Sequence, residues 1–211
     1  ILDERKNILN LESDNLVDSP RSSNVTLTNP RGNLGDNQKV FFESKEGVVN
    51  RKKKTLFLNT SARLFNVESL TKCDEMELNY KTNELVGRGE VNSFFKSGPS
   101  KLLILASRFK AKNNLENSIH FFGNVRGSHQ STEQKNDKIK FKSNLLTYSE
   151  TDKTISLEGD AVITRLLTNI HALNGKIWLN NRSDGVKYFT MNDDVRITDE
   201  FINSFGKRIK R

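Results

Sequence analysis

Residues 153–165 read Lys-Thr-Ile-Ser-Leu-Glu-Gly-Asp-Ala-Val-Ile-Thr-Arg, and this stretch decides the fold class. Its apolar side chains recur at every second position, so Ile155, Leu157 and Ile163 share one face with Gly159. A period of two is the period of a β-strand that buries one of its faces. The stretch therefore predicts a long, half-buried strand with a glycine near its centre.

The same alternation recurs several times along the chain. It is present in residues 56–64, 85–95, 117–126 and 187–197. Aligned on a small or polar central residue, the copies centre on Thr60, Gly89, Gly123, Gly159 and Asp193, with spacings of 29, 34, 36 and 34 residues. A near-constant period in this range indicates a repeated supersecondary unit. A shorter strand and a polar turn precede each long strand, so the unit is a hairpin, with roughly four full copies and a partial one at the front.

Stacking explains how such hairpins become stable. One hairpin cannot bury its apolar face in water, whereas stacked hairpins cover one another. A glycine inside a strand marks a bend, and bends at the same place in successive strands fold the sheet along one line. We therefore expect an all-β fold, a bent antiparallel β-jellyroll or slit-like β-roll of stacked hairpins. The alternative is a β-sandwich in which these glycines are ordinary bulges.

The chain divides into three parts by composition. Residues 1–38 have no sustained period and contain turn-forming segments, which predicts an N-terminal arm or linker with at most one or two helical turns. Residues 39–198 are the predicted roll. Residues 199–211 form a basic C-terminal tail, with a short amphipathic helix expected over 199–209.

Composition excludes several classes of protein. The 211 residues include 34% apolar and 28% charged side chains, and the mean hydropathy is −0.64. The longest apolar run, residues 102–106, is far shorter than the roughly 20 residues that span a bilayer. Cys73 is the only cysteine, so no internal disulfide can form. Because no signal sequence precedes Ile1, we expect that a leader or a membrane anchor lay upstream.

The motifs of enzymes are missing. The three histidines have no metal-ligand spacing, and there is neither a phosphate-binding loop nor a nucleophile motif. Asp160, Asp193 and Asp194 could hold a cation, although a solvated face is the better interpretation. The sequence predicts a protein that is not an enzyme and that has no cofactor and no metal site.

The net charge of +8 suggests an anionic partner. Residues 1–38 carry a charge of −2 and residues 39–211 carry +10. Basic clusters occur at 51–54, 138–142 and 207–211. Sheets that bind nucleic acid expose aromatic side chains among the basic ones, whereas here the phenylalanines keep to the apolar face. Nucleic acid is therefore not expected as a partner.

Read as text, the repeats resemble the OstA-like superfamily of lipopolysaccharide-transport proteins. Leu157-Glu158-Gly159-Asp160-Ala161-Val162 and Phe121-Phe122-Gly123-Asn124-Val125 are similar to the family's Leu-x-Gly-Asn-Val motif. The resemblance covers roughly residues 45–198, with 140–180 most similar to the LptA-like branch. Asp193 and Thr60 depart from the motif because they replace its glycine.

The resemblance implies a periplasmic β-jellyroll that holds the acyl chains of lipid A in an apolar groove and bridges inner- and outer-membrane components. An LptA-like role is preferred, and a membrane-anchored LptC-like component is the alternative. A structural or adhesive β-roll without lipid stays open as a third interpretation. The implied partners are lipopolysaccharide and other jellyrolls that join head to tail by strand pairing, including further copies of this chain.

The candidate lipid-binding residues share one parity along successive strands. They are Leu78, Leu85, Val91, Leu105, Phe109, Phe121, Val125, Phe141, Ile155, Leu157, Ile163, Ile177, Met191 and Val195. The strand at residues 39–43 and the one at 187–197 are the expected edges for head-to-tail pairing.

Overall fold

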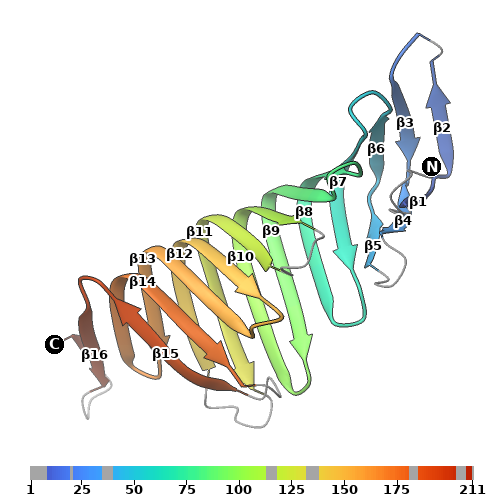
Figure 1. Ribbon diagram of the computed structural model, residues 1–211. Coiled ribbons are helices and arrows are strands. Elements are labelled where there is room, and N and C mark those ends of the chain that lie inside the picture. Colours follow the sequence, from blue (N-terminus) through green and yellow to red (C-terminus); the bar gives the residue numbers. More distant parts are fainter. Residues whose placement is uncertain are drawn as a thin grey trace. The chain divides into compact units, whose positions relative to one another are not determined.

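The computed structural model describes residues 9–19, 21–34, 40–112, 118–131, 138–180, 185–202 and 208–210. All the regular elements of these residues are β-strands, which confirms the all-β prediction (Figure 1). The described part of the chain contains no helix of the length and apolarity needed to cross a membrane. Two compact units can be distinguished. The N-terminal unit comprises Ile1–Ser93 and Ser107–Asn117, and the C-terminal unit comprises Phe94–Ala106 and Ser118–Arg211.

Eight strands belong wholly to the N-terminal unit. They are β1 (Leu9–Glu12), β2 (Asn15–Asp18), β3 (Asn24–Thr28), β4 (Arg31–Leu34), β5 (Val40–Glu43), β6 (Glu46–Asn50), β7 (Thr55–Phe65) and β8 (Ser69–Asn79). Two strands, β9 (Glu84–Ser97) and β10 (Ser100–Lys112), contribute residues to both units. The C-terminal unit holds β11 (Ser118–Ser131), β12 (Lys138–Ser149), β13 (Thr154–Arg165), β14 (Thr168–Leu179), β15 (Val186–Asn192), β16 (Arg196–Ile202) and β17 (Arg208–Lys210).

Each long strand pairs with its neighbours in two halves. In the N-terminal unit, residues 55–59 of β7 pair with β6, while residues 63–65 pair with β5. The strands β5 and β6 are therefore two halves of one interrupted strand, and β3 with β4 repeats the arrangement. In the C-terminal unit, β14 likewise pairs with β15 through one half and with β16 through the other. We call each such strand, continuous or interrupted, a rung.

The predicted bend positions are where the rungs bend. Backbone φ is positive at all five aligned positions: Thr60 (63°), Gly89 (92°), Gly123 (78°), Gly159 (73°) and Asp193 (65°). At Thr60, Gly123 and Gly159 the register shifts, so that two residues of one rung oppose a single residue of the next. Such a bulge bends the strand and increases its twist. The bent roll predicted from the repeats is confirmed, and the non-glycine positions Thr60 and Asp193 adopt the same left-handed conformation as the glycines.

The bulges also control which side chains face inward. The two residues at the bend of β13 keep the alternation of inward and outward side chains in step. Leu157 and Ala161, on either side of the bend, are therefore both buried on one face. The neighbouring rung has a single residue at the bend, so its inward-facing positions switch between odd and even residue numbers there. On β12 the buried residues are Phe141 before the bend and Leu146 after it. Alternate rungs therefore differ in their pattern of apolar residues.

The prediction of an arm at residues 1–38 is wrong for the described residues. Residues 9–34 form β1 to β4, and Val25 and Leu27 are buried within the N-terminal unit. The sequence conceals these strands because each has four or five residues, too few to establish a period. The predicted edge strand at 39–43 is also wrong, since β5 lies between β4 and β7. Lys39 itself lies outside the described residues.

The predicted helix over 199–209 is wrong as well. Residues 199–202 belong to β16, which pairs with β17 at residues 208–210. The spacing of Phe201, Ile202 and Ile209 fits one face of a helix, but Phe201 and Ile209 are directly opposed across the two strands. Pairing with a neighbouring strand has overridden a weak local pattern. Residues 203–207 and 211 lie outside the described part.

Candidate functional site

The interior of the C-terminal unit is lined by ladders of apolar side chains that cross successive strands. Paired residues place five side chains in each ladder, on β11, β12, β13, β14 and β15 in turn. The first ladder is Ile119, Tyr148, Ile155, Ile177 and Phe189, and the second is Phe121, Leu146, Leu157, Gly175 and Met191. Directly opposed residues share one face of a sheet. Neither ladder contains a charged side chain, so the lining is suited to hydrocarbon.

A third ladder lines the other halves of the same rungs. It runs through Gly127, Phe141, Ile163, Ile170 and Ile197 on β11, β12, β13, β14 and β16. The ring of Phe141 lies against Gly127, where an added Cβ would come within 2.2 Å of it. The glycine thus makes room for an aromatic ring on the neighbouring strand. Both halves of these rungs present apolar side chains inward.

Side chains from the two halves meet in the middle of the unit. Phe95 on β9 lies in the half opposite to Phe121 and Tyr148, and its ring centroid is 6.5 Å and 4.9 Å from theirs. Phe121, Leu146 and Leu157 have no exposed surface. Each such side chain contributes roughly 1.5–3 kcal/mol through burial. At this level the interior is filled by the protein's own side chains.

Burial decreases towards the last rung. In the third ladder Phe141 and Ile163 are buried, whereas Ile197 is 63% exposed. In the second, Leu157 is fully buried and Met191 is half-buried. Among the described residues, β15 pairs only with β14 and leaves its other edge without a strand. The apolar interior is therefore uncovered at the C-terminal end of this unit.

The N-terminal unit has an interior of the same kind. Leu16, Leu27, Gly47, Leu58 and Met76 form a ladder across β2, β3, β6, β7 and β8. Leu58 and Met76 are 1% exposed, and Leu16 on the outermost strand is 59% exposed. As in the other unit, the apolar ladder is covered along its length and open at its terminal rung.

Eleven of the fourteen predicted site residues are buried. They are Leu78, Leu85, Val91, Phe109, Phe121, Val125, Phe141, Ile155, Leu157, Ile163 and Ile177. Met191 is half-buried. Leu105 is 41% exposed beside the buried Ile104, so its predicted inward orientation is wrong, and Val195 on the uncovered terminal rung is 49% exposed. Leu105 has the parity of Phe109, but the bend of β10 lies between them and reverses the inward face. Contact between these residues and a lipid stays a prediction.

Several interior residues were missed, some of them because of the same reversal. The largest fully buried ones are Phe42, Leu56, Leu58, Met76, Ile104, Ile139 and Leu146. Leu56 and Leu58 lie in a recognised repeat, and the alternation of that repeat was enough to place them among the candidate lipid-binding residues. Ile104, Ile139 and Leu146 lie on rungs whose parity changes at the bend. A sequence signal for them would have been the polar residue opposite each glycine, such as Asn144.

Polar side chains at the bends bind one another. Asn144 Nδ2 donates to Asp160 Oδ2 at 3.1 Å, and Asn174 Nδ2 donates to Asp193 Oδ2 at 3.2 Å. The carboxylates proposed as cation ligands therefore brace neighbouring rungs. In the described part of the chain, no three His, Cys, Asp or Glu side chains are grouped so that they could hold a metal ion.

Cys73 is buried beside the bend of the N-terminal unit. Burial raises the pKa of its thiol to about 12, and the nearby Asp74 and Glu75 carboxylates add to the effect. Its Sγ donates to the carbonyl oxygen of Glu75 at 3.1 Å. A thiol with this pKa stays protonated at neutral pH, so Cys73 is not a nucleophile.

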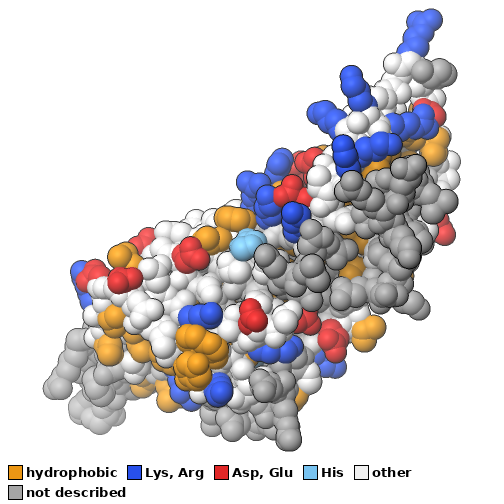
Figure 2. Space-filling view, viewed as in Figure 1, with side chains coloured by type: hydrophobic (Ala, Val, Ile, Leu, Met, Phe, Trp, Pro, Cys, Tyr) orange, Lys and Arg blue, Asp and Glu red, His pale blue; other side chains and the backbone are white. Residues whose placement is uncertain are grey.

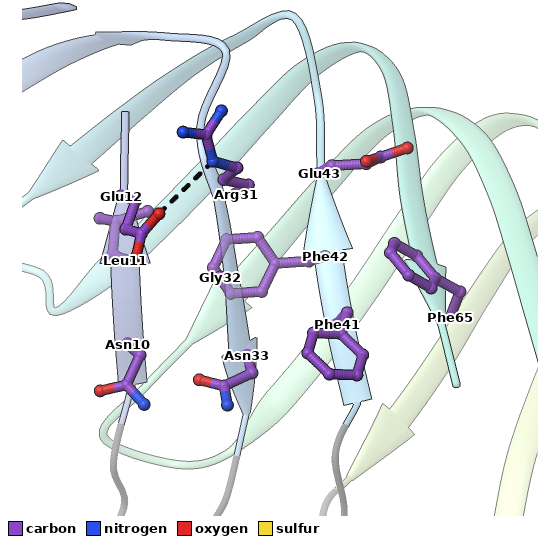
Figure 3. Close-up of a pocket in the computed structure, with 10 residues that line it drawn as sticks. All are labelled: Asn10, Leu11, Glu12, Arg31, Gly32, Asn33, Phe41, Phe42, Glu43 and Phe65. Atoms are coloured by element: carbon purple, nitrogen blue, oxygen red, sulfur yellow. Dashed lines mark hydrogen bonds and ion pairs between the residues drawn. The ribbon is translucent and has the colours of Figure 1, made fainter. Parts of the chain in front are cut away.

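A surface pocket of about 660 Å³ lies in the N-terminal unit over β1, β4, β5 and β7 (Figure 3). The stacked rings of Phe41 and Phe65, with centroids 5.6 Å apart, form one side of it. Along the other side, Arg31 forms an ion pair with Glu12 at 3.4 Å. The alternation of Glu12, Arg31 and Glu43 across neighbouring strands favours the observed register.

These features define an all-β roll of bent antiparallel rungs with an apolar interior. Among solved structures, the chain is similar to LptH, the LptA homologous periplasmic component of the conserved lipopolysaccharide transport device from Pseudomonas aeruginosa. The two share 15% sequence identity, and the match covers 61% of this chain and 92% of that chain with a TM-score of 0.47. No protein-family model and no curated protein matches the chain.

Proposed function

We propose that this chain is a periplasmic lipopolysaccharide-transport protein that holds the acyl chains of lipid A in its interior. The observation that carries the proposal is the set of apolar ladders, which run across five successive strands without a charged side chain. The motif resemblance around Gly123 and Gly159 supports the same function. The proposed location is the periplasm, with the chain either free or tethered by an upstream anchor.

The interior must open to admit an acyl chain. The two halves of each rung are joined at the left-handed bends, and side chains such as Phe95 and Tyr148 fill the space between them. Parting the halves about the line of bends would exchange these contacts for contacts with lipid. Each CH₂ group that leaves water contributes roughly 0.8 kcal/mol, so one acyl chain of ordinary length can offset the lost packing.

The open terminal rung supports a bridging role. Among the described residues β15 has one strand neighbour, and beside it Ile197 and Met191 expose apolar surface. Another jellyroll could extend the sheet by pairing with β15 and continue the apolar ladders. An LptA-like bridging component is the proposed role, and an LptC-like component of the inner-membrane export complex is the alternative.

One observation favours a second function. Phe121, Leu146 and Leu157 are fully buried, so the middle of the C-terminal unit is filled by the protein's own side chains. A closed, filled core is what a structural or adhesive β-roll requires. The two functions differ in whether the interior accepts an acyl chain, and this can be measured directly.

Photo-crosslinking tests the proposal with matched neighbours. A benzophenone side chain is placed at Phe121 or Leu157, which face the interior, and at Phe122 or Glu158, which face outward on the same strands. After illumination with lipopolysaccharide, we expect adducts from the two inward positions only. Equal capture from both faces, or none from the inward positions, contradicts lipid binding in the interior and favours the structural roll.

Sedimentation over a concentration series tests the bridging role. The whole chain and a variant lacking residues 199–211 are compared, because β17 pairs with the far half of β16. We expect head-to-tail association in at least one form, enhanced when the terminal rung is uncovered. If neither form associates with itself or with another jellyroll of the same transport system, the bridging role fails while lipid binding can still hold.

A further inference from the structure

Three turns of the N-terminal unit meet at one end of its rungs. They are residues 21–23 between β2 and β3, residues 51–54 between β6 and β7, and residues 80–83 between β8 and β9. The backbone N–H of Arg51 donates to the carbonyl oxygen of Ser23 at 2.9 Å, and that of Tyr80 donates to the carbonyl oxygen of Lys54 at 3.0 Å. Backbone hydrogen bonds thus hold the three turns side by side.

These turns carry a dense group of cations, which we call the basic rim. It consists of Arg21, Arg51, Lys52, Lys53, Lys54 and Lys81, all of them exposed. Figure 2 shows Lys and Arg side chains gathered at this end of β2, β3 and β6. Among the described residues, Asp18 forms an ion pair with Arg51 of the rim at 2.6 Å. The rim therefore carries a large local excess of positive charge.

The turn at the centre of the rim is well anchored. Asn50 Oδ1 accepts a hydrogen bond from the backbone N–H of Lys53 at 2.7 Å, and Asn50 Nδ2 donates to Asn24 Oδ1 at 2.7 Å. Arg51 makes two hydrogen bonds to the carboxylate of Asp18. The three consecutive lysines are thus presented from a fixed backbone.

Apolar side chains lie next to the rim. Val17 and Leu16 on the outermost strand β2 are 68% and 59% exposed. On the outer face, the row that begins at Val17 continues through Thr26 to the half-buried Val48 and Phe57. Cations beside exposed aliphatic side chains are the combination that membrane surfaces attract, since lipid head groups meet the charges and the interface takes up the apolar groups.

The cations of the N-terminal unit are most concentrated at this end. The turn between β7 and β8, at the other end of the rungs, contains Asn66, Val67 and Glu68 and no cation. The corresponding turn in the C-terminal unit carries Glu150 and Asp152 with one lysine. The basic rim is thus a local feature rather than a consequence of the overall charge of +8.

We propose that the basic rim docks the N-terminal unit on the surface of a membrane that contains anionic phospholipids, with Val17 entering the interface. Charge complementarity selects this partner: clusters of about four to eight basic side chains bind anionic bilayers electrostatically. Single-stranded nucleic acid fits less well, because Tyr80, the aromatic residue in these turns, is buried and offers no stacking surface. This surface contact is distinct from the proposed binding of acyl chains in the interior.

Vesicle flotation tests the proposal on the whole chain. Phosphatidylcholine vesicles are compared with vesicles that also contain about 30% phosphatidylglycerol, and binding is expected only to the anionic ones. The variant Lys52→Glu/Lys53→Glu/Lys54→Glu should lose at least about a hundredfold in partition coefficient, because each basic side chain contributes roughly fivefold. About 0.5 M salt should abolish binding of the unaltered chain.

A matched variant separates the rim from net charge. Lys138→Glu/Lys140→Glu/Lys142→Glu changes the charge equally on exposed positions of β12 in the C-terminal unit. It should bind anionic vesicles within about threefold of the unaltered chain, because these three lysines do not belong to the basic rim. Equal losses in both variants, or no loss in the rim variant, overturn the proposal.

Two further arms complete the test. Binding to anionic vesicles that disappears in millimolar inorganic phosphate would indicate a phosphate site and would contradict docking on a surface. Circular dichroism of each variant establishes that its fold is retained, which is expected because all six lysines are exposed. Photo-crosslinking of lipopolysaccharide at Phe121 should be unchanged in the rim variant, so the failure of one proposal is distinguishable from the failure of the other.

Discussion

Replacing Gly89 with alanine is expected to lower the free energy of unfolding by about 2–3 kcal/mol. Gly89 has a φ of 92°, and an L-residue pays roughly 1–2 kcal/mol to enter the left-handed region. The added Cβ would come within 2.1 Å of Asp74 Oδ2 and 2.6 Å of Asp74 Cβ. Moving Asp74 would break its 3.1 Å hydrogen bond from the backbone N–H of Glu90, which costs about 0.5–1.5 kcal/mol.

Two other glycines provide a graded comparison. Gly159 is also left-handed, but its added Cβ would meet the end of the Asn144 side chain at 2.9 Å. This side chain can turn aside and lose only part of its hydrogen bond to Asp160, so Gly159→Ala should cost about 1–2.5 kcal/mol. Gly185 has an open site, with Asn180 Nδ2 at 3.6 Å as the nearest atom. Gly185→Ala should leave stability unchanged or raise it by up to about 1 kcal/mol.

Urea denaturation followed by circular dichroism measures all three variants. The midpoints should shift in the order Gly89→Ala, then Gly159→Ala, then Gly185→Ala, with the slope of each transition unchanged. If Gly89→Ala unfolds at the same urea concentration as Gly185→Ala, an L-residue enters the bend at position 89 without cost and the account of this bend is refuted.

Three further predictions concern the core, the thiol and one strained bend. Leu157→Ala should lower the free energy of unfolding by about 2–5 kcal/mol in urea denaturation, and Leu105→Ala by less than about 1 kcal/mol, because only Leu157 is buried. Similar losses in the two variants would contradict the reversal of the inward face at the bend of β10. Cys73 should resist a disulfide reagent at pH 8 until the chain unfolds. The free energy of unfolding should fall as the pH rises from about 9 to 12, because the thiol loses its proton in the unfolded chain first. An increase in stability over this range would contradict the burial of the thiol. Thr60→Gly should raise the free energy of unfolding by about 1 kcal/mol, measured as a higher urea midpoint, because Thr60 has a φ of 63°. A lower midpoint would show that the threonine side chain holds the bend.

The repeating pattern was enough to locate the bends. Alternation with a period of two, broken at regular intervals by a small or polar residue, identified one left-handed position at each of five bends, including Thr60 and Asp193. This succeeded because a buried strand face and a left-handed residue each restrict the amino acids that can occupy a position. Both restrictions are local and leave a trace in the sequence.

Short strands left no such trace. The interrupted rungs formed by β1 to β4 consist of strands of four or five residues separated by turn-forming residues. Val25 and Leu27 alternate, but two positions do not define a period. The pairing of β3 with β6 and of β1 with β4 joins residues 18 to 26 positions apart, so it was found only in the folded chain.

The sequence by itself determined that the protein is a roll of antiparallel rungs, where each rung bends, and which face of the strands with two left-handed residues is buried. Only the tertiary structure decided which face of the alternate rungs is buried. The alternation of inward and outward side chains in these rungs depends on how many of their residues lie opposite the bulge of the neighbouring rung. Leu105 was misassigned and Ile104 missed for this reason. Tertiary structure also decided that Ile197 is exposed although it continues an apolar ladder. A side chain is buried only when another strand covers it, and the number of strands that cover a terminal rung is a property of the assembled sheet.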